Sequence, residues 1–399
     1  MDNMKAKPSF NSRRDFLKKL GLSSLPILLP GIGSAEDYSD NLFKRDNNKL
    51  INLVYDGLAY EPNDYIQKLQ EINKSSSISA DVYGTGGATQ KLEEKLAELT
   101  GKEKAIYLPT GTMANQLAIK MLNAENTKVI VPENSHIYRD ETDSAQSVHG
   151  KRLVPVQNNK AYYTAEELDE TIQNIHQNEV FKSGIGTVVI ENPVRRANGT
   201  AVPLATIQEI AAYCKSNAYK MHLDAARIHY AEAYQGVSLK EYAAPFDTVY
   251  ISLYKYLNAN GGAILCGDAE LIDRMHHQIK ILGGTMYQSW TNTAMALHYL
   301  DGITDRFKKL ADTSKEIVKA LNQLDEINIS SIDNGTNIYE LAFNSNIDIG
   351  HFVNELDNKH NIWLRPPNED GQIRLSFNES ILFRPADEIV GSIKSVLRA

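Results

Sequence analysis

The chain has 399 residues, a formal net charge of −8 and 42% hydrophobic residues, a composition typical of globular proteins and unlike disordered, collagen-like or disulfide-rich chains. This length suffices for one large α/β core and a smaller appended domain. Because binding to nucleic acid needs clustered positive charge, the acidic balance and the lack of a basic stripe exclude nucleic acid as an expected partner.

The N-terminal 35 residues are typical of an export signal. Arg13 and Arg14 form a twin-arginine pair, a modest apolar stretch covers 20–32, and small residues leading to Ala35 suggest cleavage there. The alternative, an amphipathic first helix, is opposed by the prolines and glycines in the stretch, which is also shorter than the roughly 20 apolar residues of a membrane span. The arrangement resembles a bacterial twin-arginine signal, which predicts export through that machinery as a periplasmic or otherwise exported protein with no membrane segment in its mature form.

From about residue 89 onward, helical patterns alternate with short apolar strands. In the first of these helical patterns, Leu92, Leu96 and Leu99 share one face, and Gly101 suits the C-terminal stop. Strands are expected at 129–131, 153–156, 187–190, 220–223, 248–253 and 263–266. This alternation predicts an α/β fold with a mostly parallel sheet covered on both faces.

After about residue 305 the pattern changes to helix, strand, helix, strand, helix, which predicts a smaller α+β domain. The expected divisions are a signal peptide at 1–35, an N-terminal segment at 36–80, a large domain at 81–300 and a small C-terminal domain at 301–399.

In open parallel sheets, ligands bind beyond the carboxyl ends of the strands, so the residues that follow each apolar run are candidates for a binding site. The candidates are Thr110-Gly111-Thr112, His136, Glu191-Asn192, Asp224 with Arg227, and Lys255.

Thr110, Gly111 and Thr112 open a helical pattern directly after an apolar run. A helix N-terminus presents N–H groups and partial positive charge, so these residues could bind a phosphate. Plain N-capping is the simpler interpretation for the residues taken alone. No Walker lysine or G-x-G-x-x-G pattern follows, so a nucleotide-binding fold is poorly supported.

Asp224 and Lys255 each follow or end an apolar strand. No second acid or histidine cluster lies at metal-ligand spacing, so we expect no metal; a carboxylate here could instead face a protonated pyridine nitrogen. Arg227 suits a carboxylate ligand, although a structural Asp224–Arg227 pair is the simpler interpretation. Burial of Lys255 would lower its pKa and free the amine as a nucleophile toward a carbonyl, whereas a lysine extending to solvent is the alternative.

Together, a phosphate-binding turn, a strand-end acid, an arginine and a strand-end lysine describe a pyridoxal-phosphate site. The stretches that carry a more specific likeness are DVYG (81–84), GKEKAIYLPTGTMANQLAI (101–119), HIYRDE (136–141), HLDAARI (222–228), the block around Lys255, LGGTMYQS (282–289) and IRLSF (373–377). Over nearly the whole mature length, the chain resembles the threonine aldolase / β-eliminating lyase family of fold type I pyridoxal-phosphate enzymes.

The resemblance implies a set of cofactor-binding residues. Lys255 would hold pyridoxal 5'-phosphate covalently, and Asp224 would pair with its pyridine nitrogen. Gly111 and Thr112 would bind the phosphate, and His136 would stack on the ring and assist proton transfer.

The resemblance also implies the substrate, the reaction and the assembly. Arg227 and Arg374 would hold the α-carboxylate of an amino acid substrate, and Tyr83 would lie near the site of a homodimer or homotetramer with shared active sites. The implied reaction is retro-aldol cleavage of a β-hydroxy-α-amino acid to glycine and an aldehyde, with Lys255, His136 and Asp224 as catalytic residues. β-Elimination or another pyridoxal-phosphate reaction on an amino acid is the first alternative, and a non-catalytic binding protein with the same fold is the second.

Several positions depart from the family's pattern. Tyr55 stands where the family has the serine of a Ser-Asp-Thr motif, and Tyr254 stands where it has the serine before the cofactor lysine. Tyr287 stands where the family has the arginine of a Met-Arg-Gln stretch. Thr142 and Asp143 replace a glycine pair. These changes predict a reshaped substrate pocket and an altered phosphate environment.

Overall fold

The computed structural model describes residues 50–157, 159–344 and 347–398. The predicted export signal at 1–35 lies outside these residues, and the expected domain divisions stay predictions. Among the helices of the described residues, none combines the length and the apolar character that crossing a membrane requires.

The largest layer is a seven-stranded sheet with the strand order β2-β8-β7-β6-β5-β3-β4. Its strands are β2 (Lys104–Leu108), β3 (Lys128–Pro132), β4 (Arg152–Val156), β5 (Ile185–Glu191), β6 (Lys220–Asp224), β7 (Thr248–Ser252) and β8 (Ala263–Gly267). Only β8 runs antiparallel to its neighbours, β2 and β7; the other pairs are parallel. The predicted mostly parallel sheet is therefore confirmed, and β2 joins it at one edge.

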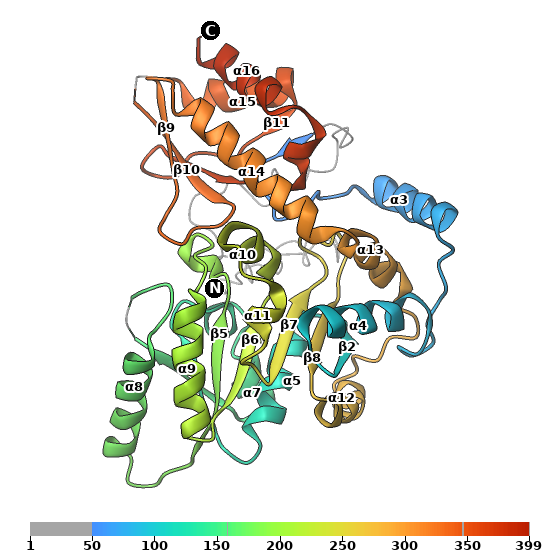
Figure 1. The fold of residues 1–399 in the computed structure, drawn as a ribbon, viewed down its shortest axis with the longest axis vertical. Helices are drawn as coiled ribbons and strands as arrows, with labels where there is room; N and C mark the ends of the chain where they lie inside the picture. Colours follow the sequence, from blue (N-terminus) through green and yellow to red (C-terminus); the bar gives the residue numbers. More distant parts are fainter. Residues whose placement is uncertain (1–49, 158, 345–346, 399) are drawn as a thin grey trace, which may run out of the picture. The chain divides into compact units, whose positions relative to one another are not determined.

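Helices cover both faces of this sheet (Figure 1). One face packs against α5 (Gly111–Asn123), α7 (Ser144–His149) and α12 (Ala269–Ile281). The other packs against α4 (Gly87–Thr100), α8 (Ala165–Asn178) and α9 (Leu204–Ser216), and α11 (Leu239–Ala243) packs beside α4. The remaining elements of this part are α3 (Pro62–Ser75), α6 (His136–Arg139), η2 (Arg195–Ala197), α10 (Ile228–Gln235) and α13 (Trp290–Leu300).

The apolar pattern explains this layering. All seven residues of β5 are buried, with Val188 and Ile190 in one core cluster and Val189 in another, because successive side chains of a strand point to opposite faces. In α4, Leu92 and Leu96 are fully buried, and the helix ends at a left-handed Gly101 (φ 68°), as the sequence predicts.

The C-terminal part contains a three-stranded antiparallel sheet of order β12-β10-β9. Its elements are α14 (Ile303–Leu321), β9 (Ile327–Ser330), β10 (Ile338–Phe343), α15 (Ile349–His360), β11 (Ile362–Trp363), β12 (Ile373–Ser376), η3 (Glu379–Phe383) and α16 (Ala386–Leu397). The sequence predicted two strands here and the described residues contain four. Three of them, β9, β11 and β12, have only two to four residues, and so short a strand shows too little periodicity to be recognised.

The segment that begins with β1 (Ile51–Asn52) connects the two sheets. β1 pairs in parallel with β11, and Leu53 both donates to Trp363 O (3.0 Å) and accepts from the backbone N–H of Ser376 (2.9 Å). A few residues later, Leu58 N donates to Asn258 Oδ1, beside the turn that follows β7 (2.8 Å). The residues between therefore run from the small sheet to the carboxyl edge of the large one.

Candidate active site

The predicted strand-end residues gather at the carboxyl edge of the large sheet. Glu191 and Asp224 end the neighbouring strands β5 and β6 and are paired in register. His136 follows β3, and Lys255 follows β7 by three residues. Because these strands are parallel, their carboxyl ends meet at one edge, where ligands bind in such sheets.

Lys255 lies in the tight turn after β7. Gly57 packs against this turn so closely that a Cβ there would lie 2.3 Å from the carbonyl oxygen of Lys255. The Lys255 ammonium lies 4.5 Å from the ring centroid of Tyr254. Burial and the neighbouring Arg227 charge lower the pKa of Lys255 to about 7, so a large fraction of the amine is uncharged near neutrality.

Asp224 is 1% exposed and is held by a polar network. Its Oδ1 accepts from Ala226 N (3.1 Å) and its Oδ2 from Asn115 Nδ2 (3.3 Å). His222 Nε2 lies 3.0 Å from Asn115 Oδ1, and its Nδ1 lies 2.8 Å from Thr248 Oγ1. Burial lowers the pKa of His222 to about 4, so the imidazole is neutral near pH 7.

Asn115 and His222 are not among the site residues predicted from the sequence. Both lie within a helix and a strand that the sequence predicts. The sequence feature that could have identified them is a polar residue at a position where the apolar pattern predicts a buried side chain. Both are fully buried, and buried polar groups need hydrogen-bond partners.

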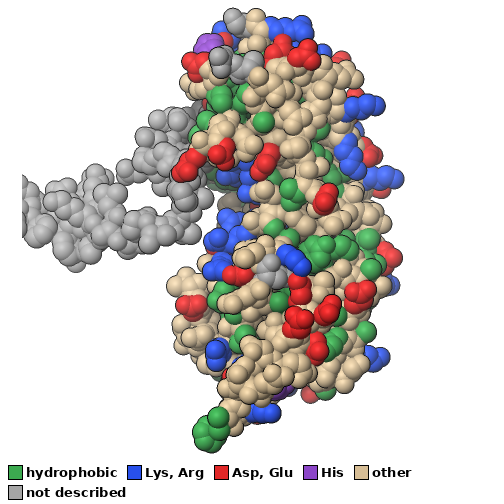
Figure 2. Space-filling model, turned by 90° about the vertical axis from the view of Figure 1, so that its left-hand side faces the viewer, with side chains coloured by type: hydrophobic (Ala, Val, Ile, Leu, Met, Phe, Trp, Pro, Cys, Tyr) green, Lys and Arg blue, Asp and Glu red, His purple; other side chains and the backbone are tan. Residues whose placement is uncertain are grey.

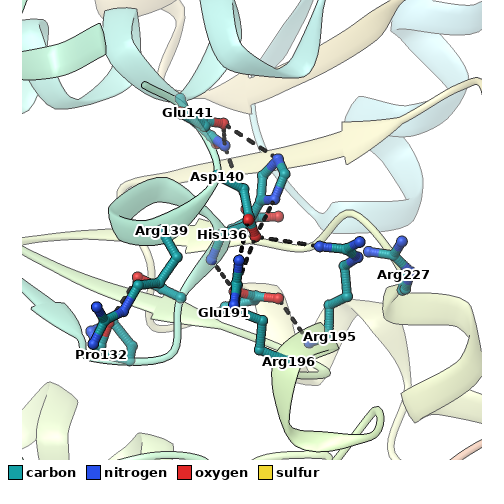
Figure 3. A network of polar contacts seen from close by, with 12 residues as sticks. Pro132, His136, Arg139, Asp140, Glu141, Glu191, Arg195, Arg196 and Arg227 are labelled. Carbon is teal, nitrogen blue, oxygen red and sulfur yellow. Dashed lines mark hydrogen bonds and ion pairs between the residues drawn. The ribbon is translucent and has the colours of Figure 1, made fainter. Parts of the chain in front are cut away.

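His136 begins the short helix α6 between two carboxylates (Figure 3). Its backbone N–H donates to Glu191 Oε2 (2.6 Å), its Nδ1 lies 3.3 Å from Asp140 Oδ2, and its Nε2 lies 3.9 Å from Glu141 Oε1. Burial lowers the pKa of His136, although the Asp224 charge opposes this. A neutral imidazole that donates from Nδ1 to Asp140 leaves Nε2 able to accept a proton.

The two buried glutamates have raised pKa values. Burial, with the Asp224 charge as a further cause, raises the pKa of Glu191 to about 7. Burial likewise raises the pKa of Glu141 to about 8. Glu141 Oε1 accepts from Asn115 Nδ2 (2.8 Å), whereas its Oε2 is buried without a partner in the part of the chain that the structure describes.

Arg227 pairs with Asp56 and not with Asp224, so the expectation of a structural Asp224–Arg227 pair is wrong. Its Nε and Nη2 donate to Asp56 Oδ2 at 2.9 and 2.7 Å. Burial raises the pKa of Asp56, but Arg227 outweighs it and holds this pKa below its usual value. The reason is tertiary: residues 171 positions apart in the chain meet when the segment after β1 reaches the sheet edge.

Arg374 lies in β12, with Glu340 as its cross-strand partner. Within the described residues its guanidinium makes no hydrogen bond or ion pair, and its Nε is buried. Burial and the neighbouring Arg365 charge lower the pKa of Arg374 to about 10. A partly buried guanidinium with no partner of its own is suited to an anionic ligand.

Tyr83 lies in the turn before α4. It is 56% exposed, its N–H donates to Tyr287 O (2.9 Å), and the two rings pack edge to face at 5.3 Å. Among the described residues, it makes no hydrogen bond or ring contact with Lys255, Asp224 or the arginines, so its place at the site depends on the expected assembly.

Thr110 caps α5, as the simpler interpretation of this turn predicted: its Oγ1 accepts from Met113 N (3.2 Å). Gly111 is the first helical residue, and a Cβ there would lie 2.1 Å from Tyr250 Oη. Thr112 follows it in the first turn. The N–H groups of this turn remain suited to a phosphate.

No group of three or more His, Cys, Asp or Glu side chains that could hold a metal ion occurs among the described residues.

Comparison with known proteins gives matches over most of the chain. The profile of the beta-eliminating lyase family matches residues 71–343. The low-specificity L-threonine aldolase of Candida albicans is 28% identical over 61% of this chain and 65% of its own length. The alanine racemase TOXG of Cochliobolus carbonum is 33% identical over 55% of this chain and 56% of its own. The chain thus spans less than two thirds of either relative.

A solved structure described as a putative L-allo-threonine aldolase from Listeria monocytogenes superposes with a TM-score of 0.73. It is 21% identical and covers 90% of this chain and 99% of its own. At this identity the likeness establishes a common fold.

Proposed function

The chain belongs to the beta-eliminating lyase family, and from this premise we propose that it is a pyridoxal-phosphate-dependent lyase that cleaves a β-hydroxy-α-amino acid to glycine and an aldehyde. The observation that carries the proposal is the Lys255 amine, whose pKa is lowered to about 7 in a turn beside the Asp224 strand end. A lysine that loses its proton near neutrality is a nucleophile toward an aldehyde.

The residues present fit the cofactor that the family implies. Lys255 would hold its aldehyde carbon, and Asp224, whose oxygens each accept only one of the hydrogen bonds described, retains acceptor capacity for a protonated ring nitrogen. Gly111 and Thr112 at the start of α5 would bind its phosphate, and His136 would stack on the ring. When bound, pyridoxal phosphate withdraws electron density from the substrate Cα.

The side chains then divide the remaining work. Arg374 and Arg227 hold the α-carboxylate, which fixes the Cα–Cβ bond in the orientation that breaks. His136 Nε2 accepts the proton of the β-hydroxyl, directly or through a water, so that the hydroxyl-bearing carbon leaves as an aldehyde. A proton then returns to Cα to give glycine.

The test is product analysis of the purified, cofactor-loaded protein with a panel of β-hydroxy amino acids. Glycine with an equimolar aldehyde supports the proposal, whereas pyruvate with ammonia indicates β-elimination. The control Lys255→Ala should give no product and no yellow absorbance. Borohydride reduction followed by peptide mapping should label position 255 and no other lysine; an unlabelled Lys255 contradicts the proposal.

We also propose that the protein works as a homodimer or homotetramer, with Tyr83 near a neighbouring subunit. Support comes from exposed apolar side chains around this turn: Val82 (50% exposed), Tyr83 (56%), Met286 (48%) and Tyr287 (61%), since exposed apolar clusters mark interaction surfaces. Light scattering coupled to gel filtration tests the assembly, and a monomer at working concentration contradicts it.

Export through the twin-arginine pathway is a separate proposal that rests on residues 1–35. This pathway carries folded proteins, which suits an enzyme that acquires its cofactor in the cytoplasm. Changing Arg13 and Arg14 together to lysine should retain the protein in the cytoplasm, and unchanged export of this variant contradicts the proposal.

A further inference from the structure

Four arginines lie near one another, and two of them contact the segment 53–56. They are Arg195 after β5, Arg227 after β6, Arg365 after β11 and Arg374 in β12. Arg365 donates from Nη2 to the carbonyl of Val54, and Arg227 donates to Asp56. Arg374 lies two residues before Ser376, whose N–H binds the carbonyl of Leu53.

The loop that contains Arg195 contacts strand β10, which pairs with the strand of Arg374. Asn198, in this loop, donates to Glu340 Oε1 (3.4 Å), and Glu340 is the cross-strand partner of Arg374. Figure 3 shows the guanidinium groups of Arg195 and Arg227 pointing toward one another. Figure 2 also shows basic side chains gathered midway along one face of the molecule.

The charges in this cluster are not balanced within the described residues. Asp56 pairs with Arg227, and Asp140 pairs with Arg195 (3.2 Å) while binding Arg196 through both of its oxygens.

Arg365 and Arg374 make no ion pair in the part of the chain that the structure describes, and the Nε of each is buried without a partner. Like charges brought together at a partly buried site are unfavourable unless an anion lies between them. The α-carboxylate of an amino acid supplies one such anion, which would bind Arg374. Arg365 would then still have no anionic partner among the described residues.

We propose that the substrate carries two acidic groups: a β-hydroxy-α-amino acid whose side chain ends in a carboxylate, with Arg374 binding the α-carboxylate and Arg365, assisted by Arg195, binding the second one. The planar guanidinium fork matches a carboxylate with two parallel hydrogen bonds. This inference rests on the lyase function proposed above and names its substrate class.

The first test compares 3-hydroxyaspartate with 3-hydroxyasparagine, which have nearly the same shape and differ in the charge of the side chain. The cofactor-loaded protein should cleave the acid with a kcat/KM about tenfold or more above that of the amide, the effect of one charged hydrogen-bonded group. Equal values, or preference for the amide, overturn this inference and leave the lyase function standing. No glycine from these two compounds or from threonine overturns both proposals.

The second test assigns the specificity to Arg365. Arg365→Gln should lower the acid-to-amide ratio of kcat/KM about tenfold, and Arg365→Lys should retain part of it because the charge remains. Arg384→Gln is the matched control, since Arg384 also lies in the small domain with a buried, unpartnered Nε and is not in the cluster. A ratio in Arg365→Gln equal to that of the control overturns the assignment.

A binding measurement makes the test independent of turnover. Calorimetric titration of the cofactor-loaded protein with aspartate and asparagine should give an affinity about tenfold tighter for aspartate. Equal affinities for the two amino acids contradict the proposal.

Discussion

The two sides of the active site are built differently. On the side expected to hold the cofactor, Asp224 and Glu191 end neighbouring strands in register, and Asn115 and His222 fix the Asp224 carboxylate from buried positions. On the side expected to hold the substrate, Arg374 and its neighbours come from loops and a short strand of separate parts of the chain.

This difference has a physical meaning. The cofactor side is positioned by the backbone register of a buried parallel sheet, which leaves the side chains little freedom. The substrate side depends on single long-range contacts such as Asp56–Arg227, and Arg374 has no hydrogen-bond partner among the described residues. Substitutions on the substrate side are therefore expected to weaken substrate binding more than they impair the chemistry.

The largest expected effect tests the cofactor side. Asp224→Asn removes the charge that faces the ring nitrogen and should lower turnover roughly a hundredfold or more, as the loss of one aligned group at a buried site does. The fold should survive because asparagine has nearly the same shape and its Oδ1 can still accept from Ala226 N, whereas its amide nitrogen cannot accept the hydrogen bond from Asn115 Nδ2. Turnover and circular dichroism are measured together with the exposed control Asp273→Asn; turnover near that of the control contradicts the role of Asp224.

The next effect tests the substrate side. Arg374→Gln should raise KM by about ten- to hundredfold, the equivalent of one charged hydrogen-bonded pair, while kcat falls less and the cofactor absorbance is retained. Steady-state kinetics with absorbance spectra check this. If the variant loses the cofactor instead of affinity for substrate, the two sides are not separable.

A smaller effect concerns the His136–Asp140 pair, between the two sides. Burial and the Lys255 charge lower the pKa of His136, whereas Asp224 and Asp140 raise it, with Glu141 facing Nε2. Removing the charge in Asp140→Asn should lower this pKa further, so the acidic limb of the pH profile of kcat/KM should move to lower pH.

The maximal rate of Asp140→Asn should also fall a few-fold, because the imidazole becomes a weaker base. Asp143→Asn, which alters an exposed neighbour, is the control. A limb that stays in place, or moves to higher pH, contradicts the pairing.

The smallest effect is on stability. Gly111→Ala places a Cβ 2.1 Å from the buried Tyr250 hydroxyl and should cost about 1–3 kcal/mol of unfolding free energy, as overpacking does. Gly391→Ala, in α16 where a Cβ meets nothing within 4 Å, should be neutral or stabilising by up to about 1 kcal/mol. Thermal unfolding of both variants makes the comparison, and an equal loss in the two would contradict the close packing at Gly111.

The sequence predicted much of the fold and part of the site. The strands β3 to β8 follow from runs of apolar residues, and the end of α4 follows from the left-handed Gly101. Both signals are local properties of the chain. His136, Asp224 and Lys255 could be selected because each follows or ends an apolar run. The short strands β1 and β11, two residues each, could not be recognised, because so few residues show no period.

The sequence by itself determined the α/β class, the strand-end residues and the family likeness, because hydrophobic periodicity and short motifs are written along the chain. Only the tertiary structure decided that Arg227 pairs with Asp56 and that Asn115, itself bound by His222, donates to Asp224. Asp56 and Arg227 are 171 positions apart and Asn115 and Asp224 are 109 apart, and no local pattern encodes a contact that forms only when separate elements pack together.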